Sequence, residues 1–213
     1  MGLSIKGKLL LFALCISLMP IATITILYYF NTRNFIKQDE LDDIAAIAES
    51  EKDHVIAFLE FKKARTSDFS TDGLIREKLE TITYGRKYKA IENLNKHLST
   101  NKKPLDTSIL EIVVLDTDGR VVAATNEALI GLNMSGHEAF TQAIHKEVGE
   151  CFTGQPRYST EFNTDCIYIS APVITSNGNG EVVGVIINVY EPEMLDDIAD
   201  IAEKKDAYRR LQL

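Results

Sequence analysis

Residues 166–190, CIYISAPVITSNGNGEVVGVIINVY, contain two apolar segments separated by a short polar one. Cys166–Thr175 and Glu181–Tyr190 have the length and the side-chain pattern of β-strands. Ser176–Gly180 between them consists only of serine, asparagine and glycine, residue types that favour turns. The stretch therefore predicts two antiparallel strands joined by a turn.

Alternation sorts the side chains of these strands onto two faces, because successive residues of a strand point in opposite directions. We expect one face to be apolar and to pack on a long helix, with Ile167, Ile169, Ala171, Val173, Val183, Val185, Ile187 and Val189. We expect the other face to mix polar and apolar groups, with Cys166, Tyr168, Ser170, Pro172, Val182, Gly184, Ile186, Asn188 and Tyr190. A face of the second kind suits a small polar ligand.

The preceding segments extend this sheet. Ile109–Asp116 and Arg120–Thr125 read as a hairpin, because Asp118-Gly119 supplies the backbone conformation that a tight turn requires. A helix is expected over Ser135–Lys146 with Ser135 as its N-cap, then a loop over Gly149–Pro156 and a strand over Arg157–Phe162. Five antiparallel strands with one helix beside a long leading helix predict an α+β domain of PAS-like type.

The first half of the chain reads as helical. Residues 31–66 contain no proline or glycine. Leu41, Ile44, Ala48, Glu51, Val55 and Phe58 recur at alternating steps of three and four, which is a heptad seam with one polar residue, Glu51. The seam favours either a homodimer through residues 39–62 or packing of this helix on its own domain. Two shorter helices are expected over Leu74–Thr83 and Ala90–Leu98.

Leu9–Phe30 holds 22 residues without a formal charge, which is long enough to cross a bilayer as a helix. We interpret it as an uncleaved transmembrane anchor; the alternative is a cleaved secretory signal, which its length and its ending at Tyr28-Tyr29-Phe30 disfavour. Lys6 and Lys8 precede the span and all 31 acidic residues follow it. The positive-inside rule then places residues 1–8 in the cytoplasm and residues 31–190 outside it.

A further helix is expected after Pro192, within residues 191–213. Its segment LDDIADIAE at 195–203 repeats LDDIAAIAE at 41–49 in eight of nine positions. Either the two segments share an amphipathic pattern by coincidence, or the two helices run near each other and share a packing partner.

Composition excludes several functions. The net charge of −8, with every acidic residue after the apolar segment, argues against nucleic acid as a partner. The four histidines show no metal-binding spacing, and no cofactor motif is present. Cys151 and Cys166 both follow the anchor, where a disulfide is permitted; the alternative is two buried free thiols.

The combined pattern resembles the extracytoplasmic Cache (PAS-like) sensor domains of membrane-bound histidine kinases, chemoreceptors and cyclic-dinucleotide enzymes. The resemblance rests on the membrane helix with its long extension, on VVLDTDGRVVAAT, on IGLNMSGHEAFTQAI, and on the paired strands IYISAPVIT and VVGVIINVY. His137 departs from it, because many members carry arginine at that place. The chain also ends at Leu213 without an output domain. The resemblance implies ligand sensing and signal transduction across a membrane.

We expect the ligand to lie between the mixed sheet face and the 135–146 helix. The ligand would be an amino acid or a short carboxylate. Hydrogen bonds would come from Tyr158, Tyr168, Ser170 and Asn188, with Phe140 as an apolar wall. His137 would help to bind an anion, while Arg157 and Asp165 would meet a ligand carboxylate and amine, respectively.

Two other functions share part of this pattern. An anchored extracytoplasmic hydrolase needs a nucleophile with a base or a metal, and no such motif is found. A pilin-like subunit shares the plan of a membrane helix, a long helix and a sheet. Those proteins carry a glutamate five residues after a processing glycine, and Phe12 stands at that place after Gly7.

Overall fold

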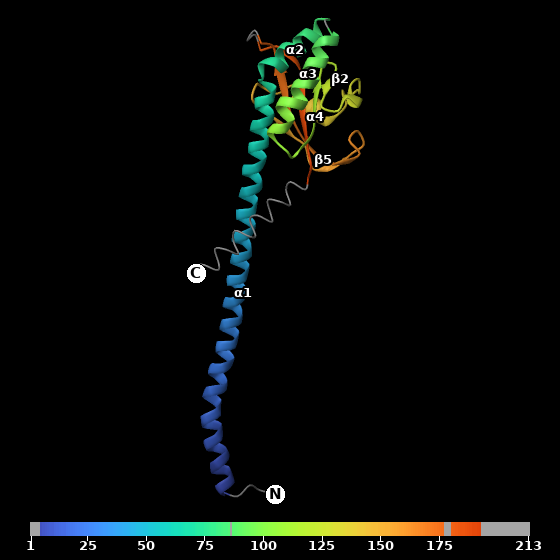
Figure 1. The fold of residues 1–213 in the computed structure, drawn as a ribbon. Coiled ribbons are helices and arrows are strands. Elements are labelled where there is room, and N and C mark those ends of the chain that lie inside the picture. Colours follow the sequence, from blue (N-terminus) through green and yellow to red (C-terminus); the bar gives the residue numbers. More distant parts are fainter. Residues whose placement is uncertain (1–4, 86, 177–179, 193–213) are drawn as a thin grey trace. The chain divides into compact units, whose positions relative to one another are not determined.

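A computed structural model of the chain describes residues 5–85, 87–176 and 180–192 (Figure 1). It divides into two compact units, one up to Lys52 and one from Asp53 onward. A single helix, α1 (Ile5–Ser70), contains both the predicted span and the predicted 31–66 helix. Among the described residues, no helix is identified as long and apolar enough to cross a bilayer. The anchor at residues 9–30 stays a prediction, and the helix predicted over 195–203 lies outside the described residues.

The second unit contains an antiparallel sheet. Its strands are β1 (Ile109–Leu115), β2 (Val121–Ala124), β3 (Phe152–Thr153), β4 (Arg157–Ser159), β5 (Thr164–Ile174) and β6 (Val182–Tyr190). The spatial order is β2-β1-β6-β5-β3, and β4 pairs with the first part of β5. The last described strand therefore lies between β1 and β5, in the middle of the sheet.

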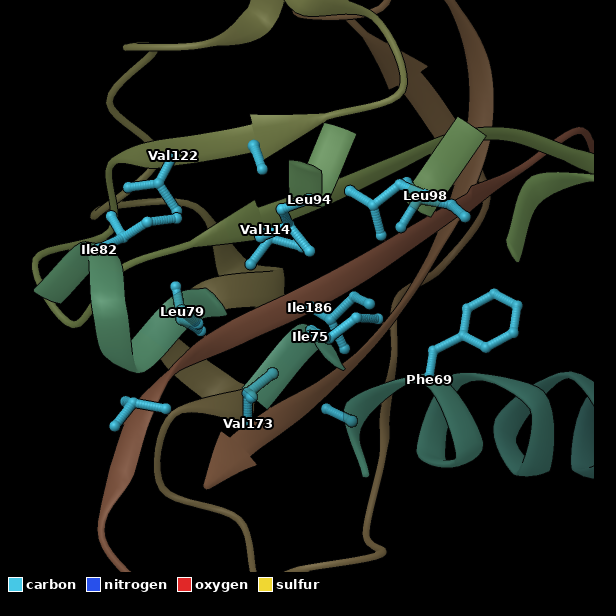
Figure 2. Close-up of a cluster of buried hydrophobic side chains, with 14 of the residues drawn as sticks. Phe69, Ile75, Leu79, Ile82, Leu94, Leu98, Val114, Val122, Val173 and Ile186 are labelled. Carbon is cyan, nitrogen blue, oxygen red and sulfur yellow. The ribbon is translucent and has the colours of Figure 1, made fainter. Parts of the chain in front are cut away.

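One face of the sheet is covered by the end of α1 and by two helices, α2 (Gly73–Thr83) and α3 (Lys87–His97). Figure 2 shows this core, in which Phe69 of α1 and Ile75 and Leu79 of α2 gather with Val114 and Ile186 of the sheet. Helix α3 continues into a π-helical turn, η1 (Leu98–Lys102), and a 3-10 turn, η2 (Lys103–Leu105). Asp72 caps α2, since its carboxylate accepts the backbone N–H groups of Leu74 and Ile75.

The opposite face carries a second core beneath a short helix, α4 (Glu138–Ala143). Ala139, Phe140 and Ala143 of α4 are buried there against Tyr168 and Ile187. A 3-10 turn, η3 (Glu127–Leu129), leads from β2 toward this helix. Both faces of the sheet are thus filled by apolar side chains, and a ligand site has to be built at the margin of one of these cores.

The structure confirms the long helix, both short helices and the β1–β2 hairpin, in which Gly119 has a φ of 76°. Helix α4 is shorter than expected and starts three residues later. Asn133 accepts the backbone N–H of Ser135, and His137, not Ser135, is the N-cap. The segment expected to be a loop includes β3, so that the described sheet has six strands instead of five. The strand expected over Arg157–Phe162 ends at Ser159.

Candidate functional site

Three polar side chains meet at the margin of the α4 core. His137 caps α4, Arg157 projects from β4, and Tyr168 comes from β5. The rings of His137 and Tyr168 stand edge to face with centroids 4.6 Å apart, and the Arg157 guanidinium lies 5.7 Å from the Tyr168 ring centroid. Arg157 Nη1 also lies 3.1 Å from Glu138 Oε2. We call His137, Arg157 and Tyr168 the α4-margin cluster.

The cluster brings two hydrogen-bond donors face to face. His137 Nδ1 accepts the backbone N–H of Ala139 at 3.2 Å, so the proton of the neutral imidazole has to sit on Nε2. Nε2 lies 3.4 Å from Arg157 Nη2, which is also a donor. An acceptor oxygen within hydrogen-bonding distance of both nitrogens would satisfy both donors. The arrangement therefore favours an anionic or carboxylate group at this position.

Burial and charge keep His137 neutral. Desolvation is the larger cause that lowers the pKa of His137 below 6.5, and the positive charge of Arg157 lowers it further. The carboxylates of Glu161 and Glu138 act in the opposite direction. A bound carboxylate would add to their effect and would raise the pKa of His137.

The Tyr168 hydroxyl is buried without a hydrogen-bond partner of good geometry among the described residues, although the side chains of Ser159 and Cys166 lie beside it. Burial raises the pKa of Tyr168 far above 10, so the group is a neutral donor. A buried hydroxyl without a partner costs free energy, and a ligand oxygen within reach would remove that cost.

Ser170 and Phe140 line the same face but make structural contacts. The Ser170 hydroxyl is fully buried and donates to the carbonyl oxygen of Ala139 at 2.7 Å, which ties β5 to α4. Phe140 is packed in the α4 core. Both contacts hold α4 in place behind the cluster. Phe140 as the apolar wall of the ligand site stays a prediction.

The expectation that Asn188 shares a face with Tyr168 is wrong. Tyr168 pairs with Val189 and Ile169 pairs with Asn188, so Asn188 points to the α1 side. There its amide donates to Thr66 Oγ1 of α1 at 2.9 Å. The same register moves Val185, Ile187 and Val189 to the α4 core, and a bulge at Val173/Ile174 leaves Val183 on the α1 side.

Near Asn188, a buried ion pair joins α1 to the segment before β1. Lys62 Nζ lies 2.6 Å from Asp106 Oδ2 and 2.7 Å from Ser108 Oγ, and both charged side chains are more than nine-tenths buried. The Tyr190 ring lies 5.3 Å from the same ammonium. We call Lys62, Asp106, Thr66 and Asn188 the α1–β6 polar network.

Tyr158 and Asp165 also lie away from the cluster. They face each other across the β4–β5 pair, whereas Arg157 faces Cys166 on the side of Tyr168. The Tyr158 hydroxyl donates to Asn163 Oδ1 at 2.8 Å, and both Tyr158 and Asp165 are exposed. The structure therefore brings together His137, Phe140, Arg157, Tyr168 and Ser170 and separates Tyr158, Asp165 and Asn188 from them.

The two cysteines outside the predicted anchor are free thiols. Cys151 packs at the α1 core and donates to the carbonyl oxygen of Lys63 at 3.3 Å, whereas Cys166 is buried in the α4 core. They lie on opposite faces of the sheet, so the disulfide alternative is wrong and the free-thiol alternative holds. Burial raises the pKa of Cys151 to about 11.

Sequence reasoning missed Glu138 and Phe162. Glu138 pairs with Arg157, and the ring of Phe162 lies tilted against that of Tyr168 with centroids 6.0 Å apart. Neither contact has a signal in the sequence, because the first joins α4 to β4 and the second depends on the turn after β4. Two cavities are also new: one of about 680 Å³ between α1 and the loop at Cys151, and one of about 310 Å³ at the β1–β2 turn.

The fold is similar to solved sensor domains. The sensor domain of the V. cholerae histidine kinase DctB superposes with a TM-score of 0.63 at 17% identity, covering 76% of this chain and 60% of that one. The ligand-binding domain of the Pseudomonas fluorescens chemoreceptor CtaA, solved with L-serine, gives a TM-score of 0.51 at 14% identity, covering 76% and 63%. The sensory domain of the Campylobacter jejuni chemoreceptor Tlp3, solved with isoleucine, gives 0.50 at 13%, covering 72% and 60%.

The chain has a Cache-type sensor fold. It spans about three fifths of the length of these solved domains. No family model and no curated protein matches the sequence. The three Cache-type structures are sensor or ligand-binding domains of receptors.

Proposed function

We propose that the chain is an extracytoplasmic ligand-sensing domain for signal transduction that binds a small molecule of the amino acid or short carboxylate class at the α4-margin cluster. The observation that carries the proposal is the pair of facing donors, His137 Nε2 and Arg157 Nη2, between which no acceptor from the described part of the chain lies. The neighbouring Tyr168 hydroxyl, buried without a well-oriented partner, supports it. The Cache-type fold supports the sensing role.

The ligand carboxylate would lie between His137 and Arg157, and Tyr168 would donate to one of its oxygens. Arg157 keeps 44% of its side-chain surface exposed, so it can turn away from Glu138 to admit the ligand. Closure of Arg157 over the ligand would then alter the contacts of β4 and β5. Binding can shift the domain only by the difference in affinity between its two conformations.

Calorimetry of the full chain with L-serine, L-alanine, L-isoleucine and short carboxylates tests the site. For a ligand that binds, Arg157→Gln should weaken affinity about ten- to a hundredfold, the range for a hydrogen bond to a charged group. Tyr168→Phe should weaken it about two- to tenfold.

Tyr158→Phe is the matched control, because its hydroxyl is bonded to Asn163 and points away from the cluster. Unchanged affinity in both Arg157→Gln and Tyr168→Phe would show that the site is misplaced. Failure of every compound to bind would contradict the ligand class.

The membrane anchor at residues 9–30 and the extracytoplasmic location of the domain belong to the same proposal. The uncharged run and the position of Lys6 and Lys8 support them. Protease treatment of intact cells should digest the chain beyond Arg33 and leave the preceding residues protected. Protection of the domain in intact cells, with digestion only after lysis, would contradict this topology.

A further inference from the structure

A cavity of about 310 Å³ lies at the other side of the sheet from the α4-margin cluster. It is bounded by the end of α2, by α3, by the β1–β2 turn and by Ile130-Gly131. Its volume is at the lower end of the range for small-ligand pockets, about 300–1,000 Å³. Strand β2 is the edge strand here, whereas Arg157 and Tyr168 lie on β4 and β5, beyond β1 and β6. The two sites are therefore separate.

The inner wall of the cavity is apolar. Ile82 and Val122 are more than nine-tenths buried, and Ile91 and Ile130 are partly buried beside them. An alkyl group placed on this wall would leave water for an apolar surface, which favours binding in proportion to the apolar area buried. The wall selects for a ligand with a short aliphatic part.

The mouth of the cavity is charged. Asp116 and Asp118 lie on the turn, and Arg120 stands beside them. Arg120 Nη1 donates to the carbonyl oxygen of Gly131 at 3.3 Å, so the guanidinium already has an acceptor. Among the described residues, no hydrogen bond or ion pair engages the Asp118 carboxylate. Asp116 and Asp118 carry two negative charges at the mouth, and Arg120 carries one positive charge. The excess of negative charge favours a ligand with a cationic head group.

The turn that carries these carboxylates is fixed. Asp116 Oδ1 accepts the backbone N–H groups of Asp118 at 3.1 Å and of Arg120 at 2.9 Å. Gly119 has a φ of 76°, and a Cβ there would lie 2.5 Å from the Cα atom of Ser135. The turn is packed against the following segment, so its backbone and the Asp116 carboxylate are held before a ligand arrives, which lowers the entropy cost of binding.

We propose that this cavity binds a short aliphatic amine, with its alkyl group on the isoleucine and valine wall and its ammonium group at Asp116 and Asp118. The proposal goes beyond the sensing function described above and does not depend on it.

The test uses the full chain in detergent micelles with ¹³C-labelled isoleucine δ1 methyl groups. Titration with n-butylamine should shift the methyl signals of Ile82, Ile91 and Ile130 and leave that of Ile144, in the α4 core, unchanged. n-Butanol and butyrate present the same alkyl group without the positive charge and should bind more weakly.

Asp118→Asn should weaken n-butylamine binding about two- to fivefold, as for an exposed ion pair. Asp53→Asn removes the same charge from an exposed position on α1 and should change nothing. Ile130→Trp should fill the cavity and abolish the shifts of Ile82 and Ile91, while the unchanged Ile144 signal reports an intact fold. Tyr168→Phe should have no effect on this binding.

Two results would overturn the proposal. The first is the absence of shifts at Ile82, Ile91 and Ile130 up to the highest amine concentration at which the protein stays soluble. The second is equal binding of n-butanol and n-butylamine together with an unchanged affinity in Asp118→Asn. Both results are independent of whether the α4-margin cluster binds a ligand.

Discussion

At the scale of single residues, the α1–β6 polar network is costly to disturb. Lys62 and Asp106 are both more than nine-tenths buried, and the ammonium contacts both carboxylate oxygens. A buried ion pair contributes little net stability, because desolvation of the two charges offsets their attraction. The removal of one partner is costly, since it leaves the other charge buried and unpaired.

Lys62→Met should therefore destabilise the domain by about 3–5 kcal/mol, because it leaves the Asp106 carboxylate without its cation. Urea denaturation of the full chain measures the loss. The double variant Lys62→Met, Asp106→Leu should recover most of it, since no charge is left in the core. A double variant as unstable as the single one would show that the ion pair itself stabilises the fold.

The same carboxylate predicts a dependence of stability on pH. The ammonium of Lys62 and the Ser108 hydroxyl outweigh the desolvation of Asp106, so its pKa in the folded chain lies below 3.8, the value for an unperturbed group. The stabilisation is present above pH 3.8 and is lost as the pH falls through the lower folded pKa.

Urea denaturation from neutral pH down through this window should show a steeper loss of stability than for Asp106→Asn. Some loss should persist in the variant, because the pKa of Asp72 is also lowered. Identical pH curves for the two proteins would contradict the assignment.

Much of the α4-margin cluster could be predicted from the sequence. Alternation placed Tyr168 on the sheet face that was expected to lie against the 135–146 helix, and His137 lies near the start of that helix. Asn188 could not be placed in the same way. Strand β6 carries valine or isoleucine at both alternating sets of positions, so its composition does not select a register. A shift of one residue exchanges the two faces, and Asn188 lies opposite Ile169, not Tyr168.

At the scale of elements, β6 is held between its neighbours with no spare room at Gly184. A Cβ at this position would lie 2.0 Å from the carbonyl oxygen of Leu115 on β1 and 2.8 Å from Leu79 on α2. The close approach of α2 to the sheet depends on this glycine, and sequence alternation gives no sign of it.

Gly184→Ala should destabilise the domain by about 1–3 kcal/mol, the usual cost of overpacking, and more if β1 and β6 separate. Thermal unfolding measures the effect. Gly136→Ala is the matched control, because a Cβ there meets no atom within 4 Å. Equal melting temperatures for the two variants would contradict the close packing of α2 on β6.

Helix boundaries were the other limit of prediction. Ser135 has the side chain of a helix cap, yet Asn133 binds its backbone N–H in a turn, and α4 begins only after His137. The sequence allows a cap at Ser135 or at His137. The structure has the cap at His137, which places Ala139, Phe140 and Ala143 of α4 in the core. As the N-cap, His137 accepts the backbone N–H of Ala139 at Nδ1, which leaves the proton on Nε2, and its ring lies beside that of Tyr168.

At the scale of the whole molecule, the heptad seam of α1 favours either association of two copies or packing on its own domain. The seam positions include Leu41, Ile44, Ala48 and Val55, and the Ile44 side chain is 63% exposed. We propose a parallel homodimer through residues 39–62, since two anchored chains would enter the membrane side by side.

Single cysteines at Ile44 or Ala48, in a chain whose native cysteines are replaced by serine, should form an intermolecular disulfide on mild oxidation in membranes. A cysteine at Asp53, which lies off the seam, should not. Equal yields at all three positions would indicate random collision instead of a specific dimer.

The central place of β6 also has a consequence for biogenesis. The β1–β2 hairpin and β5 have no common partner until residues 182–190 are present, since β6 pairs with both β1 and β5. A nascent chain whose residues after the predicted anchor cross a membrane in sequence order must therefore remain without a closed sheet until β6 arrives. A message interrupted anywhere before Tyr190 would yield an unprotected substrate for quality-control proteases.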